Sequence, residues 1–299
     1  MSLGCNCDAG LSNTGRPNCV PIQSVTSKLI MVNIKANDGT LNYIDLSTTL
    51  PTWSDLINEN DPSKRWFPLP VFENVELPKA DSQFEEANSG RMAFLRQGKR
   101  SFSGELWSDD STPTLLGKLN AGRCVDFGVY IVDVNGTLVG SKVGDKLYPI
   151  PVDTPSFDPR FMFATDSSVQ KIMLGFDFDR LFDESTMYQI TSAEAGIDFN
   201  SLTGLVDVNI VNLTQSVGVS ATFDCQLDYG TAVNPLTFKG ATAVDFELTE
   251  NGTPVVFTLA ENLPLEGNYT LTYAFVNGAN YELSVVRDGF EGSTQFVGL

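Results

Sequence analysis

Three of the five cysteines lie within the first nineteen residues, in the segment MSLGCNCDAGLSNTGRPNCVPI. Thiolates bind zinc, form disulfides and carry redox chemistry, so Cys5, Cys7 and Cys19 are the first candidates for a chemical site. A closed structural zinc site needs four ligands, and the fourth would come from Asp8, a later cysteine or a second copy of the chain. Unlinked thiols, a disulfide within or between these segments, a metal and a redox role all stay open.

The segment around these cysteines, residues 1–22, is rich in Gly, Asn, Ser and Pro and has no apolar periodicity. Such a segment buries too little apolar surface to fold alone, so we expect an extended N-terminal arm without a catalytic role. Cys5 and Cys7 are one residue apart, which makes a bond between them difficult. If a disulfide forms, we expect Cys19 to pair with one of them, or a bond between subunits.

The strongest acidic cluster is DFDRLFDE, which contains Asp177, Asp179, Asp183 and Glu184. Spaced carboxylates suit a hard cation such as Ca²⁺, but the glycine turn of a calcium loop is missing. Asp177 and Asp179 also occupy the polar positions of an alternating strand. The pattern therefore predicts a solvated strand face and no metal site.

Other catalytic arrangements lack their residues. The chain has no histidine, so it cannot form a Ser-His-Asp or Cys-His site, and it has no phosphate-binding glycine loop. Nothing singles out a carboxylate pair of the glycosidase type. We expect Trp53, Trp66 and Trp107 to pack in a core or an interface, and Cys124 and Cys225 to be small buried residues. The sequence predicts no enzyme and no cofactor.

Net charge excludes a tight nucleic-acid binder. The formal charge is −18, from 19 basic and 37 acidic residues, and no basic stripe is visible. Residues 1–200 hold 17 basic and 26 acidic residues and residues 201–299 hold 2 and 11, so each part carries −9. No apolar run reaches the roughly 18 residues that span a bilayer, and no signal peptide is present, so we expect synthesis in a cytoplasm without a membrane partner.

Residues 23–203 predict a mainly antiparallel β domain with one flanking helix. SVTSKLIMVNIKA alternates through Leu29, Met31 and Ile34, and NDG turns it into a hairpin with TLNYIDLS. STPTLLGKLNAG has the cap, apolar face and glycine stop of a helix. CVDFGVYIVDVNGTLVGSKV predicts a hairpin, and VQKIMLGFDFDRLF predicts a strand with one buried face.

Two further segments bear on contacts with neighbours. The stretch FEEANSGRMAFLRQGKRSFSGELW predicts two strands, with turns at Ser89-Gly90 and Gln97-Gly98. Residues 48–80 contain five prolines and predict a long connection with one helical turn at TWSDLIN. A connection of that length is usually functional or contacts a neighbour.

The pattern of strands and turns changes at residue 204, and residues 204–299 predict a second domain. About seven short strands follow one another in about 96 residues, separated by turns at Asn251-Gly252 and Asn277-Gly278. This spacing is typical of an immunoglobulin-like sandwich. LEGNYTLTY has the Gly-x-Tyr spacing of a tyrosine corner, which makes Tyr269 its candidate.

The order of these elements resembles the tail tube proteins of long-tailed bacteriophages. The resemblance rests on the β-rich domain with its helix, the hairpin RMAFLRQGKRSFSGEL and the later VQKIMLGFDFDRLFDESTMYQIT. An immunoglobulin-like domain at the C-terminus is a recurrent addition in that family. The CNCDAGLSNTGRPNC opening is similar to the N-termini of structural proteins from phages of Bacteroidetes-type hosts.

The resemblance implies a tail-tube-type β-sandwich or barrel that forms hexameric rings. The rings stack into a hollow tube in the virion tail, which is assembled in the host bacterial cytoplasm and conducts DNA at ejection. Partners would be other copies of the chain and other phage tail proteins, with DNA passing in transit and not tightly bound. The N-terminal arm and residues 48–80 would reach neighbouring subunits. The rival interpretation is a capsid decoration or fibre protein that binds host surface glycans.

Overall fold

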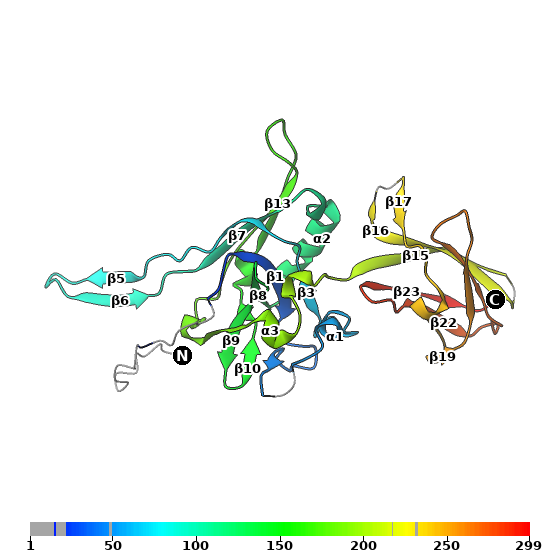
Figure 1. Cartoon of the computed structure of the whole chain (residues 1–299), viewed down its shortest axis with the longest axis horizontal. Coiled ribbons are helices and arrows are strands. Elements are labelled where there is room, and N and C mark those ends of the chain that lie inside the picture. The colour runs from blue at the N-terminus through cyan, green and yellow to red at the C-terminus, as the bar shows by residue number, and fades with distance from the viewer. Residues whose placement is uncertain (1–14, 16–21, 48–49, 217, 231–232) are drawn as a thin grey trace.

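The computed structural model describes residues 15, 22–47, 50–216, 218–230 and 233–299. Cys5, Cys7, Cys19 and nearly all of the predicted N-terminal arm lie outside these residues. The described chain forms two β-rich units with separate cores: two clusters lie between Leu29 and Leu202, and a third lies between Val208 and Val285 (Figure 1). The chain is mainly β, as the sequence predicts.

The first domain is built on two facing sheets. The larger has the order β2-β10-β9-β8-β1-β3, with β11 and β14 pairing with β8 and β9, and the smaller has the order β12-β13-β7-β4. Strands of the larger sheet are β1 (Thr26–Asn33), β2 (Ile44–Asp45), β3 (Trp66–Pro68), β8 (Phe127–Asp133), β9 (Leu138–Val143), β10 (Lys146–Tyr148), β11 (Ile150–Pro151) and β14 (Met187–Ile190). Strands of the smaller sheet are β4 (Glu73–Glu76), β7 (Ser101–Trp107), β12 (Asp158–Met162) and β13 (Lys171–Asp177).

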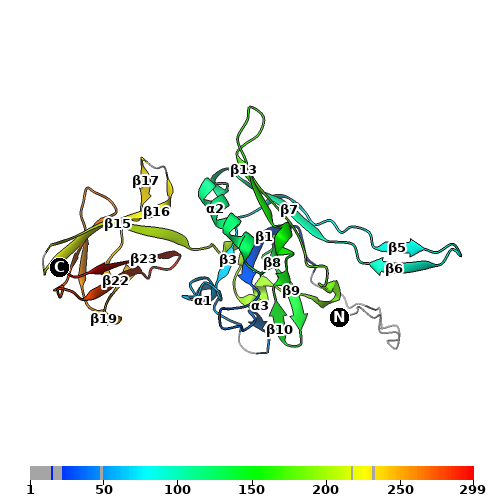
Figure 2. The same cartoon turned by 180° about the vertical axis from the view of Figure 1, so that it is seen from behind.

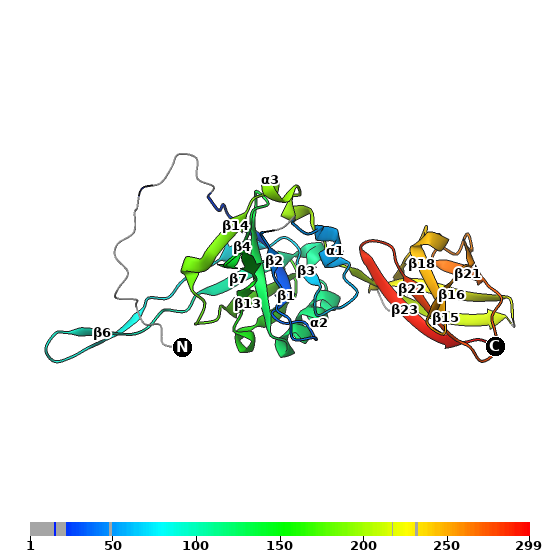
Figure 3. The same ribbon diagram turned by 90° about the horizontal axis from the view of Figure 1, so that it is seen from below.

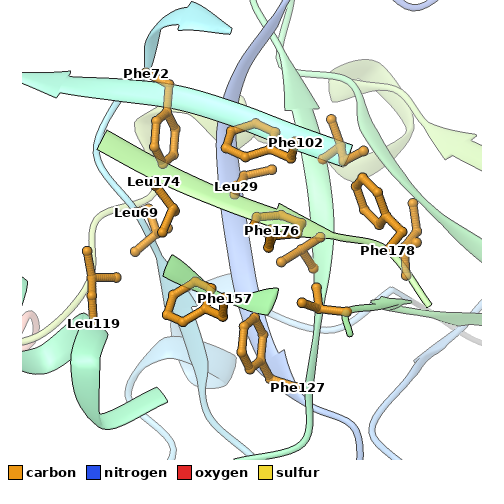
Figure 4. Packing of buried hydrophobic residues seen from close by; sticks show 14 of the residues in the cluster. Leu29, Leu69, Phe72, Phe102, Leu119, Phe127, Phe157, Leu174, Phe176 and Phe178 are labelled. Carbon is orange, nitrogen blue, oxygen red and sulfur yellow. The ribbon is translucent and has the colours of Figure 1, made fainter. Parts of the chain in front are cut away.

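The smaller sheet packs an aromatic face into a core that it shares with Phe127 and Val129 of β8 in the larger sheet. The predicted alternation of β13 is confirmed: Ile172, Leu174 and Phe176 are buried, and Phe176 stacks on Phe102 of β7 with ring centroids 5.0 Å apart (Figure 4). The predicted helix is also confirmed as α2 (Pro113–Ala121). Its Thr112 cap accepts a hydrogen bond from the Leu115 N–H, which satisfies one free amide of the first turn.

A second apolar cluster covers the other face of the larger sheet. It contains Trp53 of α1 (Trp53–Ile57), Trp66 of β3, and Tyr130 of β8. The strand predicted at SVTSKLIMVNIKA is confirmed as β1, but its burial does not alternate: Leu29 and Ile30 are both fully buried, because β1 lies between two cores. The helical turn predicted at TWSDLIN is confirmed as α1, but the description of residues 48–80 as a connection is wrong, since they also supply β3 and β4 to the sheets.

Short elements complete the domain. A single antiparallel bridge between Lys35 and Leu41 closes the predicted NDG turn. The following strand β2 pairs with β10 and not with β1, so the predicted hairpin is limited to this bridge. The hairpin of β8 and β9 is confirmed. The remaining helical elements of both domains are α3 (Ser192–Ala195), η1 (Ser108–Asp110), η2 (Gly122–Cys124), η3 (Thr154–Ser156), η4 (Glu184–Thr186), η5 (Phe199–Ser201) and η6 (Ala243–Asp245).

The second domain has the strand order of an immunoglobulin-like sandwich. One sheet pairs β15-β16-β21-β20, with β17 beside β16, and the other pairs β23-β22-β18-β19. β15 and β23 join in parallel, which matches the pairing order ABED and GFCC′ of the fold. The strands are β15 (Val206–Ser216), β16 (Ser220–Gly230), β17 (Pro235–Thr237), β18 (Phe246–Glu250), β19 (Thr253–Val255), β20 (Thr258–Glu261), β21 (Asn268–Thr272), β22 (Asn280–Val285) and β23 (Phe290–Val297).

The tyrosine corner lies at a different residue from the predicted one. Tyr269 is on β21, and its hydroxyl donates to the Phe238 carbonyl, thirty-one residues upstream. Tyr281 is on β22, the strand equivalent to F, and its hydroxyl accepts from the Val276 N–H only five residues upstream, 2.9 Å away. Tyr281 therefore forms the corner, and the Gly-x-Tyr spacing indicated the wrong tyrosine.

Candidate functional site

A two-stranded hairpin projects from the first domain, on the side opposite the immunoglobulin-like domain (Figures 1 and 2). It consists of β5 (Gln83–Glu86) and β6 (Met92–Arg96), which pair only with each other. We call residues 77–101, which connect β4 to β7 through this hairpin, the hairpin arm. The view from below places the arm and the second domain at opposite ends of the molecule (Figure 3).

The pairing within the arm corrects the prediction for this stretch. β6 was expected to form a hairpin with the SFSGELW strand through Gln97-Gly98, but it pairs with β5 across the Ser89-Gly90 turn. Gly90 has φ +78°, a left-handed conformation that suits glycine. At Gly98 the two antiparallel halves of the arm approach so closely that an added Cβ would lie 1.6 Å from the Ala80 carbonyl oxygen. Gln97-Gly98 is therefore a close backbone approach and not a turn.

The outer part of the arm exposes a group of large apolar side chains. Phe84, Met92, Phe94 and Leu95 are each between 52% and 61% exposed. Phe84 and Phe94 are opposite one another in register and meet edge to face, with centroids 5.7 Å apart. An isolated two-stranded hairpin is at best marginally stable in water, and it gains stability by packing on another surface. These four residues, which we call the arm tip, are the candidate contact surface.

The root of the arm is held by charged hydrogen bonds. Glu184 accepts from Lys79 Nζ at 2.7 Å and from Arg100 Nε at 2.8 Å. Asp177 accepts from Lys99 Nζ at 2.6 Å and from the Ser101 hydroxyl at 2.7 Å. Each carboxylate thus binds side chains from the arm, and Glu184 connects the incoming half of the arm, through Lys79, to the outgoing half, through Arg100.

Ion pairing shifts the titration of both root carboxylates. The hydrogen bond from the Arg100 guanidinium has the largest effect on the pKa of Glu184 and lowers it; burial opposes this, and with the further hydrogen bond from Lys79 the pKa stays below its ordinary value of 4.5. For Asp177, burial acts to raise the pKa, but hydrogen bonds from Lys99 and Ser101 outweigh it and lower the pKa. Both groups are therefore anionic at neutral pH and bind the arm there.

The predicted acidic cluster thus has a structural role that the sequence did not indicate. Asp177 and Glu184 hold the arm, while Asp179 and Asp183 accept from the backbone N–H groups of Leu181 and Ser185 in local turns. Asp177 lies on the half-exposed face of β13, as the alternation predicts, and it is ion-paired there with Lys99. Among the described residues, no group of three or more acidic or cysteine side chains is arranged to hold a metal ion.

The other sequence candidates separate by burial. Trp53 and Trp66 pack in the core, with centroids 5.7 Å apart, whereas Trp107 is exposed and donates to Glu105. Cys225 is buried as expected, and burial raises its pKa to about 12. Cys124 is exposed, which contradicts the expectation that it is a buried packing residue, because it ends η2 at the surface.

The comparisons with known proteins leave the family open. No protein-family model matches the chain, and no curated protein matches its sequence. Among solved structures, the chain is similar to the full ectodomain (Ig1–Ig3) of mouse nectin-like molecule 4, at 8% identity over 91% of this chain and 88% of that chain, with a TM-score of 0.18. A likeness this low carries no argument, and the immunoglobulin-like assignment rests on the strand pairing. The helices within the described ranges lack the length and apolar character needed to cross a membrane.

Proposed function

We propose that the protein is a self-assembling virion subunit, the tube-forming protein of a long-tailed bacteriophage. Its first domain forms hexameric rings that stack into a hollow conduit for DNA ejection. The observation that carries this proposal is the hairpin arm: a projecting two-stranded ribbon whose apolar tip has no partner in the described chain other than its own residues. A surface of this kind is stabilised by a neighbouring subunit.

The charge distribution supports a conduit through which DNA slides. The net charge of −18 disfavours adhesion of a phosphate backbone. Lys99 and Arg100 at the arm root and Lys171 on β13 are each paired with a carboxylate of the same chain. Their charge is compensated, so an acidic excess on the bore wall follows from the proposal.

Mass photometry of the purified chain over a range of concentrations and salts tests the proposal. Species of six subunits and larger multiples are expected as concentration rises. A monomer at every concentration and salt would contradict it.

A second candidate function, a decoration or fibre protein that binds host surface glycans, is favoured by a different observation. A groove of about 700 Å³ lies on the sheet containing β18, β22 and β23. Thr249, Glu282 and Gln295 are neighbours across three strands in its lining, beside Asn251 and Asn280. Amide, hydroxyl and carboxylate groups can bind sugar hydroxyls. Saturation-transfer NMR with neutral saccharides, using Glu282→Ala/Gln295→Ala as control, tests this candidate: no saccharide signal would exclude it.

A further inference from the structure

Apart from Leu205, which packs against the second apolar cluster of the first domain, polar bonds connect the two domains, among them one from the Gly289 N–H to Asn58 Oδ1 at 3.3 Å. Arg65, in the loop before β3, donates to both carboxylate oxygens of Glu291 on β23, with Nη1–Oε2 at 2.5 Å and Nη2–Oε1 at 3.0 Å. The Arg65 side chain is only 7% exposed, and its Nε donates to the Glu59 carbonyl at 2.8 Å. This bidentate geometry fixes the direction of the carboxylate as well as its distance.

A second contact lies on helix α2. Lys118 Nζ is 2.7 Å from Asp207 Oδ2 on β15 and 3.2 Å from Asp228 Oδ2 on β16, and it lies 5.5 Å from the centre of the Tyr229 ring. Burial acts to lower the pKa of Lys118, but pairing with the two carboxylates outweighs it and raises the pKa. Thr114 of the same helix donates to the Asp228 carbonyl.

The charge composition of the domains determines which domain supplies the cations and which supplies the carboxylates. Residues 1–200 and 201–299 each carry −9, so the domains repel each other at long range. Every ion pair described between them uses a cation of the first domain and a carboxylate of the second. The second domain contains only two basic residues, Lys239 and Arg287, and Lys239 pairs with Glu266 of its own domain.

We propose that Arg65 and Lys118 form an electrostatic latch that sets the orientation of the immunoglobulin-like domain. The latch holds that domain at two places, the start of β23 and the adjoining parts of β15 and β16, and two attachment points oppose rotation about residues 203–205. Without the latch, the hydrogen bonds of Thr114 to Asp228 and of Gly289 to Asn58 are too weak to fix two like-charged domains, and the second domain reorients. The inference is independent of the proposed function, because it concerns the single chain.

The test compares rotational diffusion of the two domains by ¹⁵N NMR relaxation on the full chain, in a dilute solution where it is monomeric. In the native protein the two domains should share one correlation time. In the double variant Arg65→Glu/Lys118→Glu they should show two distinct, shorter correlation times. Lys239→Glu, which breaks an ion pair inside the second domain, is the matched control and should leave one shared value.

Two further measurements separate a latch from a fold defect. Adding Glu291→Arg to Arg65→Glu should return the domains toward a common correlation time, because the pair is restored with reversed charges. In the native chain, raising salt from about 0.1 M to about 1 M shortens the Debye length from about 10 to about 3 Å, which screens the long-range repulsion between the domains more than the close, largely buried Arg65–Glu291 pair. The native domains should therefore keep one shared correlation time at high salt. One shared correlation time in Arg65→Glu/Lys118→Glu, or two in the native chain at high salt, would overturn the proposal.

Discussion

Replacing Phe84 and Phe94 by serine should disperse the assembled protein into monomers without unfolding it. Burying a Phe side chain completely contributes about 1.5–3 kcal/mol, and each ring is 52% exposed in the single chain. Covering the exposed half against a neighbour therefore contributes about 1 kcal/mol per ring, and losing both rings costs about 2 kcal/mol per contact. That loss weakens each contact about 30-fold, and the effect multiplies over the contacts of a ring.

Sedimentation velocity over a concentration series measures this change. The onset of assembly should move to a concentration at least tenfold higher in Phe84→Ser/Phe94→Ser, while thermal unfolding of the domain cores stays within about 2 °C of the native protein. Val256→Ser removes a side chain that is 94% exposed on the second domain, so it controls for the loss of exposed apolar surface elsewhere. An unchanged onset in the double serine variant would refute the assignment of the arm tip as a contact surface.

Three further outcomes follow from the structure. Gly98→Ala should disrupt the close backbone approach to Ala80, where a Cβ would lie 1.6 Å from the carbonyl oxygen. Hydrogen exchange of the arm amides should then accelerate while the core amides stay protected. Because ion pairing lowers the pKa of Glu184 in the folded chain, the stabilisation of the arm root by Glu184 is present at neutral pH and is lost as pH falls through the range below 4.5. After correction for the intrinsic pH dependence of exchange, the hydrogen exchange of the arm amides should rise over that range in the native protein. A flat exchange profile there would contradict the role of Glu184 at the arm root. Tyr281→Phe removes the hydrogen bond to the Val276 N–H and should lower the unfolding free energy of the second domain by about 1 kcal/mol in a urea titration, whereas no change would contradict the corner assignment.

Local sequence signals predicted the elements whose causes are local. The Thr112 cap and the glycine stop define α2, the alternation of Ile172, Leu174 and Phe176 defines β13, and the strand spacing after residue 204 defines an immunoglobulin-like sandwich. In each case the residues that determine the element lie within the element or beside it. The physical signal is therefore contained in a short window of sequence.

Features that depend on distant partners could not be predicted in this way. Burial of both faces of β1 requires the second core from Trp53 and Trp66, which no window around β1 contains. Glu184 binds Arg100 across 84 positions, so its role at the arm root has no local signature. β6 has two adjacent candidate partners, and both turns contain glycine, so turn chemistry alone does not select β5.

The chemical state of the three N-terminal cysteines stays a prediction with several alternatives. Cys5, Cys7 and Cys19 lie outside the described residues, so a disulfide, a metal and free thiols stay as predictions. Non-reducing electrophoresis of the assembled protein distinguishes them: a ladder of linked chains indicates bonds between subunits, and zinc analysis near one per chain indicates a metal.

Electron microscopy of the purified full-length protein, at concentrations above the onset of assembly, tests the central proposal most directly. The account predicts stacked rings of six subunits that form a hollow tube, with the hairpin arm in contact with a neighbouring subunit. Discrete monomers or trimers under the same conditions, with the arm tip facing solvent, would contradict it.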